Sequence, residues 1–195
     1  MHQNSIDPRS IRSREWIFKA LKELLAATEY DKITVIMLTD RAGVGRSTFY
    51  RNYSRMDDVL LEQIHQKLDD FDLFLEQTVP GSSAGFPLML LDPMFRFWMN
   101  DSSLLELLLR AERIQLFHQA VLARQSFLSQ SMVAGLPYRH AQFVRGVGIS
   151  MLTTALVQWV SGGKQETPEE LARLVSRYLF EGGELVQNLP ENHQP

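Results

Sequence analysis

The sequence of 195 residues contains no cysteine. This absence excludes a disulfide scaffold, a thiolate metal site and a cysteine nucleophile. No apolar run approaches the roughly 20 residues that cross a bilayer, and the first residues lack the charged, apolar and small-residue pattern of a signal peptide. We therefore expect a cytoplasmic protein with no membrane partner.

Sequence motifs of catalysis are missing too. There is no Gly-x-Ser-x-Gly elbow, no phosphate-binding glycine loop and no His-Glu-x-x-His. His118 and His140 each lack a second histidine or a carboxylate one helical turn away, so we expect no metal site. The sequence thus predicts no enzyme activity, no catalytic residue and no cofactor.

Strand patterns are almost missing as well, because alternating β-branched runs joined by Asn-Gly or Asp-Gly turns do not occur. Hydrophobic residues recur instead at helical spacing. This pattern predicts an all-α protein of about nine helices. The expected helices cover about 8–28, 35–42, 46–53, 55–78, 88–99 with an interruption at Pro93, 102–112, 114–134, 138–161 and a last one from 168.

Capping residues support several of these boundaries. Thr34 is placed to cap the second helix, and Ser54 followed by Asp57 predicts a capping box for the fourth. Gly162 and Gly163 predict the end of the long apolar segment. The run from Thr167 to Glu170 combines a cap, a proline at the first helical position and acids in the first turn, which predicts a new helix start.

Charge is spread unevenly along the chain. The net charge is −3, but residues 1–55 hold ten Lys and Arg against six Asp and Glu, whereas residues 56–195 hold ten against seventeen. A basic amino-terminal part on an acidic remainder favours a polyanionic partner. Chance variation over a mixed surface would give the same asymmetry, so charge alone leaves both interpretations open.

The stretch 39–53, Thr-Asp-Arg-Ala-Gly-Val-Gly-Arg-Ser-Thr-Phe-Tyr-Arg-Asn-Tyr, has the spacing of a helix-turn-helix. Thr39 is small enough for a second helix to cross closely, Gly43 supplies a turn residue with positive φ, and Phe49 is an apolar anchor. Arg, hydroxyl and Tyr side chains then remain for bases or phosphates. An ordinary helical corner with a polar outer face fits the same spacings.

The residues Ile33-Thr34-Val35, Ala42 through Tyr53, and Asp57-Asp58-Val59-Leu60 resemble the DNA-binding signature of TetR-type transcriptional regulators. The resemblance covers about residues 10–62. A weaker resemblance, from Trp159 to Gly163 and from Glu166 to Leu171, is to the subgroup that contains regulators of dihydroxyacetone utilisation.

The resemblance implies a helix-turn-helix DNA-binding domain at 1–53 and a helical regulatory and dimerisation domain at 54–195. It implies that the third helix enters the major groove. The implied contacts to bases or phosphates are Thr34, Arg46, Ser47, Thr48, Tyr50, Arg51 and Tyr53. Met56 stands where the family usually has a lysine, so we expect Arg55 to take over that phosphate. Ile36 and Met37 replace polar residues usual in the family.

The second domain is rich in aromatic residues and methionines, which can line an adaptable apolar pocket or simply form a core. The candidate pocket residues for a small apolar or amphipathic ligand are Phe95, Trp98, Met99, Phe117, Phe127, Phe143 and Met151. Glu106, Glu112, Arg110 and Arg113 are expected to form solvated pairs on a helix face.

Small residues recur every four positions at Gly146, Ser150 and Thr154, which would let another helix approach closely. Packing within one chain would explain this face equally well. The resemblance favours a homodimer through the last two helices.

The sequence as a whole predicts a ligand-responsive repressor that binds a palindromic double-stranded operator as a homodimer. Two alternatives remain open: a ligand-independent DNA-binding adaptor whose second domain recognises a protein partner, and an activator. A pocket lined by the aromatic residues would favour the ligand, and an exposed apolar patch on a packed domain would favour the adaptor.

Overall fold

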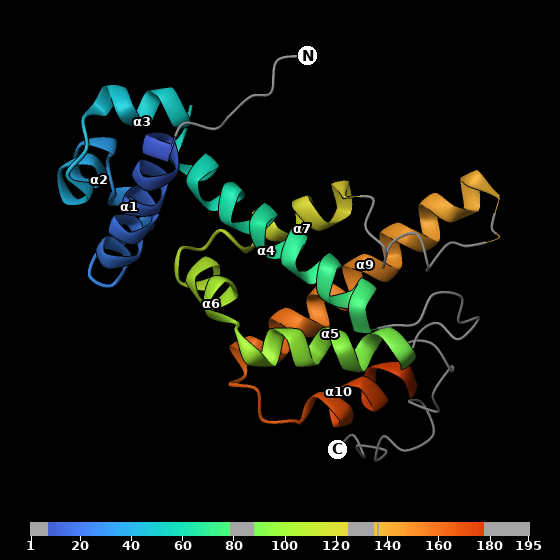
Figure 1. Ribbon diagram of the computed structural model, residues 1–195. Helices are drawn as coiled ribbons and strands as arrows, with labels where there is room; N and C mark the ends of the chain where they lie inside the picture. The colour runs from blue at the N-terminus through green and yellow to red at the C-terminus, as the bar shows by residue number, and fades with distance from the viewer. Residues whose placement is uncertain (1–7, 79–87, 125–134, 136, 178–195) are drawn as a thin grey trace, which may run out of the picture. The chain divides into compact units, whose positions relative to one another are not determined.

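The computed structural model describes residues 8–78, 88–124, 135 and 137–177. These residues form nine α-helices and one short 3-10 helix, with no strand among them, so the all-α prediction is confirmed (Figure 1). The chain divides into two compact units, Met1–Lys67 with Ser103–Ala120 and Leu68–Ser102 with Val121–Pro195. The functional division after residue 53 stays a prediction.

The first unit contains α1 (Pro8–Leu25), the 3-10 helix η1 (Tyr30–Lys32), α2 (Val35–Ala42), α3 (Arg46–Asn52) and α6 (Ser103–Arg110). α1 packs against α2 and α3 (Figure 1). The side chains between them are apolar and fully buried: Ile17, Leu21, Leu38 and Phe49. Because their burial is the main stabilising contribution, these residues hold the three helices in one arrangement.

α4 (Met56–Thr78) begins where the sequence predicted, but a different acid caps it. Asp58 accepts hydrogen bonds from the backbone N–H groups of Ser54 and Arg55, each at 2.8 Å. The sequence predicted Asp57 as the acid of the capping box, and that assignment was therefore wrong. Asp57 instead accepts a hydrogen bond from the Tyr30 hydroxyl at 2.7 Å, since the neighbouring 3-10 helix brings that ring within reach.

The second unit contains α5 (Leu88–Asn100), α9 (Tyr138–Ser161) and α10 (Pro168–Val175), and α5 lies alongside α10. The rings of Phe95 and Trp159 meet edge to face with centroids 5.6 Å apart. Pro93 lies inside α5, so the predicted interruption there was wrong. A proline removes one backbone hydrogen bond, which burial of its neighbours Leu91, Met94 and Phe95 offsets here.

The predicted end of α9 and the predicted start of α10 are confirmed. Gly163 has a φ of 83°, beyond the last turn of α9. Thr167 accepts from the N–H of Glu170 at 3.2 Å, while the Glu170 carboxylate accepts from the N–H of Thr167 at 2.8 Å. This reciprocal capping box satisfies two N–H groups that the helix itself cannot.

The predictions for the linker at 79–87, for residues 125–134 of the expected 114–134 helix, and for the carboxyl-terminal tail lie outside the described residues. The described part of that helix is α7 (Ile114–Ala123). Within the described residues, α9 is the one helix whose length and apolar composition would suffice to cross a membrane. Leu152, Leu156 and Trp159 of α9 are buried in the protein, as in an ordinary core helix.

Candidate nucleic-acid interface

The turn between α2 and α3 has the geometry that the sequence predicted. Gly43 ends α2 with a φ of 67°, a left-handed conformation that favours glycine. The N–H of Val44 donates to the carbonyl of Thr39 at 3.0 Å and closes the corner. Thr39 is buried, and its hydroxyl donates to the Val35 carbonyl at 2.8 Å. The segment is therefore a helix-turn-helix, in which α3 is the second helix.

α3 has one buried and one exposed face. Phe49 is fully buried and packs against the rings of Tyr50 and Tyr53, with centroids 5.3 and 5.6 Å away. The opposite face carries the side chains predicted to contact DNA. Arg46, Ser47, Tyr50 and Arg51 are exposed, and Thr48 is half-buried. Because Phe49 anchors the helix, these side chains are presented on a fixed scaffold.

Two predicted contacts flank α3 in the sequence. Thr34 caps α2, where its hydroxyl oxygen accepts from the N–H of Met37 at 3.2 Å, and its side chain remains exposed. Arg55 keeps 70% of its side-chain surface exposed and stays 3.7 Å from the Asp58 carboxylate. Both side chains are therefore open to solvent, and their phosphate contacts stay predictions. Ile36 and Met37 on α2 are exposed as well, so the apolar substitutions noted in the sequence lie on the surface.

Tyr53 differs from the other predicted contacts. Only 5% of it is exposed, and its hydroxyl donates to the Glu62 carboxylate of α4. Burial raises the pKa of Tyr53, and the hydrogen bond to Glu62 raises it further. This placement argues against the phosphate contact predicted for Tyr53, because the hydroxyl is already bound inside the protein.

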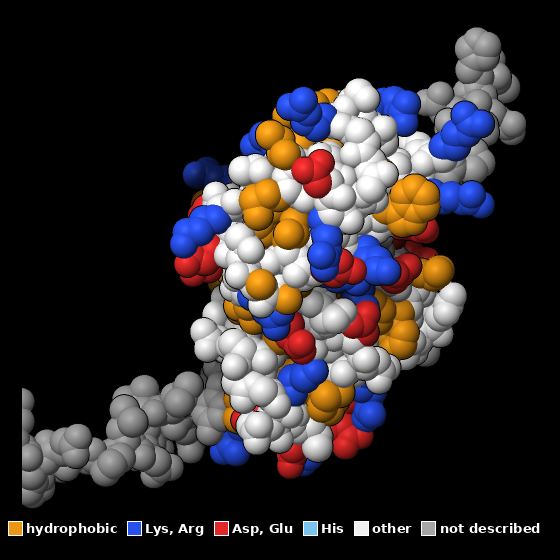
Figure 2. Space-filling view, turned by 90° about the vertical axis from the view of Figure 1, so that its left-hand side faces the viewer, with side chains coloured by type: hydrophobic (Ala, Val, Ile, Leu, Met, Phe, Trp, Pro, Cys, Tyr) orange, Lys and Arg blue, Asp and Glu red, His pale blue; other side chains and the backbone are white. Residues whose placement is uncertain are grey.

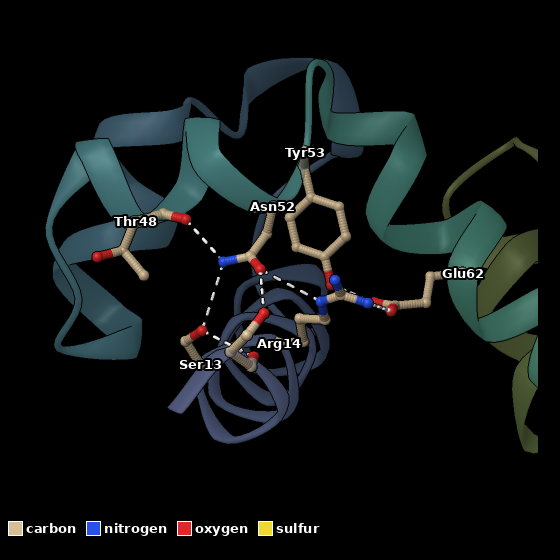
Figure 3. A network of polar contacts seen from close by, with 7 residues as sticks. Ser13, Arg14, Thr48, Asn52, Tyr53 and Glu62 are labelled. Atoms are coloured by element: carbon tan, nitrogen blue, oxygen red, sulfur yellow. Dashed lines mark hydrogen bonds and ion pairs between the residues drawn. The ribbon is translucent and has the colours of Figure 1, made fainter. Parts of the chain in front are cut away.

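A polar network behind α3 was missed by the sequence analysis (Figure 3). Asn52, the last residue of α3, accepts from the Ser10 hydroxyl at 2.6 Å and from Arg14 Nε at 3.2 Å. Arg14 also forms an ion pair with Glu62 at 2.6 Å. No local pattern could have revealed the network, because its members lie about forty residues apart in the sequence.

Arg113, at the corner between α6 and α7, was also misassigned. Its guanidinium pairs with Asp31, lies 3.7 Å from Asp57 and covers the ring of Tyr30. The expectation of a solvated pair on a helix face was therefore wrong for Arg113. The cause is that α6 ends at Arg110 and the turn that follows includes Glu112 with a φ of 55°, which directs the next side chain toward η1 and α4.

The predicted pocket residues are divided between the two units. Phe95 and Trp98 are buried in the second unit, and Phe117 is buried in the first. Met99 and Met151 are half-buried, while Phe143 is 69% exposed on α9. Phe127 lies outside the described residues. A ligand site therefore remains a prediction.

Charged side chains of both signs lie on this side of the molecule without forming a continuous basic patch (Figure 2). Figure 2 views the side on which α1, α2 and α3 lie and shows Lys and Arg side chains interspersed with polar and apolar ones. Some cations are paired, as Arg41 is with Glu23 at 2.6 Å. Among the described residues, no group of three or more His, Asp or Glu side chains could hold a metal ion.

Comparisons with known proteins bear on this arrangement, although no family model matches the chain. A Haemophilus influenzae protein described as an uncharacterized HTH-type transcriptional regulator is 24% identical over 191 residues, which cover 90% of this chain and 91% of that protein. A TetR transcriptional regulator from Streptococcus agalactiae superposes with a TM-score of 0.55 at 24% identity, covering 86% of this chain and 93% of that chain. The chain has the TetR-regulator fold.

Further solved structures are similar to this chain in fold. Lin0861 from Listeria innocua gives a TM-score of 0.72 at 16% identity, over 91% of this chain and 94% of that one. The fatty acid degradation regulator FadR from Bacillus halodurans gives a TM-score of 0.52 at 19% identity, over 83% of this chain and 91% of that one. These matches extend beyond the helix-turn-helix and cover 83–91% of this chain.

Proposed function

We propose that this TetR-like protein is a DNA-binding transcriptional regulator, a ligand-responsive repressor that binds a palindromic operator as a cytoplasmic homodimer. The observation that carries the proposal is the exposed face of α3, where Arg46, Ser47, Tyr50 and Arg51 project from a helix anchored by buried Phe49. The HTH-type regulator of Haemophilus influenzae supports regulation rather than catalysis.

On DNA, the exposed side chains of α3 would enter the major groove. Guanidinium groups form bidentate hydrogen bonds with guanine edges, and hydroxyl groups bind phosphates or bases. Thr34 and Arg55, both exposed at the ends of neighbouring helices, would bind backbone phosphates and fix the register. A twofold dimer would then read two half-sites separated by about 34 Å, one turn of B-DNA, or by a multiple of it.

The homodimer is supported by an apolar face on α9. Phe143, Val144 and Val147 are 69%, 42% and 58% exposed. A Cβ atom added to nearby Gly146 would meet nothing within 4 Å, so among the described residues no side chain fills the space beside it. A second copy that brings the same face across a twofold axis would cover these side chains.

The ligand would act by shifting the spacing of the two DNA-binding parts away from the half-site spacing. The candidate residues in the described part of the second unit, Phe95 and Trp98 above all, pack as core. The adaptor and activator alternatives therefore stay open. A thermal-shift screen of small apolar and amphipathic compounds separates a ligand-responsive regulator from a ligand-independent adaptor, because a protein that binds a ligand gains stability.

The proposal is tested by selecting genomic fragments bound by the purified protein and measuring their affinity. We expect one palindromic fragment class to bind, and Arg46→Ala to weaken binding by about tenfold or more. Lys22→Ala is the matched control, because Lys22 is an exposed cation in the last turn of α1 and belongs to the same unit. Absence of any selected fragment, or equal effects of the two substitutions, would refute the proposed role of α3.

A further inference from the structure

The network behind α3 joins three helices through one guanidinium group (Figure 3). Arg14, on α1, donates from Nε to the side-chain oxygen of Asn52 on α3 and from Nη1 to Glu62 on α4. The distances are 3.2 and 2.6 Å. Because the guanidinium is planar and its N–H directions are preset, the positions of the two acceptors are coupled.

Asn52 passes this constraint to the backbone of α3. Its amide nitrogen donates to the Thr48 carbonyl at 2.8 Å, one turn earlier in the same helix, and approaches the Ser13 hydroxyl at 3.4 Å. The amide oxygen accepts from Ser10 and Arg14 of α1. All four hydrogen-bonding positions of the amide are thus occupied, and α3 is held at its end by α1.

Glu62 closes the network from the other side. One carboxylate oxygen accepts from Arg14 and the other from the Tyr53 hydroxyl, directly after α3. The Glu62 side chain is only 17% exposed, whereas that of Arg14 is 36% exposed. A partly buried carboxylate with both oxygens engaged restricts its partners more than a surface pair does.

We infer that Arg14 and Glu62 are positioning residues for DNA recognition: they set the orientation of α3 without binding DNA themselves. This inference rests on the proposed DNA-binding function. Arg14 would otherwise be expected to act as one more cation for a phosphate, and Glu62 as a carboxylate that weakens DNA binding. In the network, neither residue acts on DNA through its charge. Each instead holds α3 in place through its hydrogen bonds.

The two roles predict opposite results for conservative substitutions. Arg14→Lys keeps the positive charge but has a single nitrogen, which cannot bridge Asn52 and Glu62 in the same geometry. A phosphate contact would survive this change and a positioning role would not. Glu62→Gln removes a negative charge, so simple electrostatics predicts tighter DNA binding. Loss of positioning predicts weaker binding.

The experiment measures the operator affinity of the full-length protein by fluorescence anisotropy at several salt concentrations, using the genomic fragment selected by the wild type. We expect Arg14→Lys, Arg14→Gln and Glu62→Gln each to weaken operator binding by about tenfold or more. The slope of log K against log salt should stay unchanged. Binding to an unrelated duplex should change by less than about threefold, because it depends on phosphate contacts.

Three outcomes would overturn the inference: wild-type affinity for Arg14→Lys, a slope reduced by about one unit in Arg14→Gln, or unchanged or tighter binding by Glu62→Gln. Tyr53→Phe provides a milder variant, since it removes one hydrogen bond to Glu62 and keeps the buried ring. It should weaken operator binding in the same direction, and wild-type affinity would count against the inference.

Circular dichroism and thermal unfolding first establish the temperatures at which each variant is folded. Operator affinity is then measured only at those temperatures. A folded variant that binds the operator as the wild type does, despite a lower unfolding temperature, would show a merely structural role and overturn the inference. Failure of the wild type to select any fragment refutes the proposed function instead, so the two failures are distinguishable.

Discussion

The guanidinium of Arg113 lies over the ring of Tyr30, with its Cζ atom 4.6 Å from the ring centroid. The same guanidinium pairs with Asp31 and approaches Asp57, which accepts the Tyr30 hydroxyl hydrogen bond. Burial raises the pKa of Tyr30, and the hydrogen bond to Asp57 raises it further, so the hydroxyl stays a donor throughout the physiological range. One side chain between α6 and α7 thus binds both η1 and the start of α4.

Replacing Arg113 should loosen this attachment. Only 20% of its side chain is exposed, whereas Asp31 is 75% exposed, so most of the effect should come from Tyr30 and Asp57. We expect Arg113→Ala to destabilise the first unit by about 1–3 kcal/mol and to speed amide hydrogen exchange in η1 and α6. Urea unfolding and exchange mass spectrometry measure the two effects.

Arg110→Ala is the control for Arg113, because Arg110 is an exposed residue in the last turn of α6. A surface change of this kind usually alters stability by less than about 0.5 kcal/mol. Equal effects of the two substitutions would contradict the attachment described for Arg113.

Gly43 should be the residue of the helix-turn-helix corner least tolerant of a side chain. Its φ of 67° strains any residue with a Cβ, although no atom lies within 4 Å of the place a Cβ would take. We expect Gly43→Ala to cost about 1–2 kcal/mol by thermal unfolding. Gly43→Asn should cost less, because asparagine adopts the left-handed region more readily.

Gly45, two residues later, provides a contrast. Its φ is −74°, and a Cβ there would meet only the Ser47 side chain at 3.6 Å. Since serine is a favourable residue at the start of a helix, Gly45→Ser should leave stability unchanged or slightly raised. If Gly45→Ser lowered stability as much as Gly43→Ala, steric crowding rather than backbone conformation would limit substitution in this corner.

The capping box of α10 predicts a pH dependence. Hydrogen bonds from the Thr167 N–H and hydroxyl lower the pKa of Glu170. A lowered folded-state pKa means that Glu170 stabilises the folded protein above its unfolded pKa, about 4.3, and that this contribution is lost as pH falls through the folded value.

NMR titration of the Glu170 carboxyl measures that shift directly. In Thr167→Ala the pKa should move back toward the ordinary value, because the hydroxyl hydrogen bond is removed while the backbone N–H remains. An unshifted Glu170 in the wild type would contradict the capping geometry.

The apolar face of α9 predicts the oligomeric state. Val147→Glu places a charge among exposed Phe143 and Val144, where a second copy would bury it. We expect a dimer for the wild type and a monomer for the variant by analytical ultracentrifugation at micromolar concentration. Both proteins should have the same circular dichroism, since Val147 is exposed in a single chain.

Gln142→Glu serves as the control for α9, because Gln142 is exposed but lies more than a quarter turn around the helix from Val147. It should stay dimeric. A monomeric wild type would refute the twofold arrangement, and a dimeric Val147→Glu would place the interface elsewhere.

Features that depend on neighbours within about four residues were predictable from the sequence. The cap at Thr34, the turn at Gly43, the buried anchor Phe49 and the box from Thr167 to Glu170 were all placed correctly. Each follows from backbone geometry and from hydrogen bonds inside one helical turn, for which residue identity and spacing are enough.

Features that depend on partners distant in sequence were not predictable. Pattern alone could not assign the cap of α4 to Asp58, because both Asp57 and Asp58 follow Ser54. Asp57 is bound instead by the Tyr30 hydroxyl, whose position depends on the tertiary structure. Tyr53 had the spacing of a contact residue, but it is buried, and its hydroxyl donates to Glu62 of α4.

The sequence by itself determined that this protein is helical, where most helices begin and end, and which stretch forms the helix-turn-helix. Only the tertiary structure decided that Arg14 bridges three helices and that Arg113 turns inward to Tyr30. The physical reason is how far apart in sequence the interacting groups lie. Helix and turn formation are governed by local sterics and hydrogen bonds, whereas the partner of a long charged side chain depends on which helices the hydrophobic core brings together.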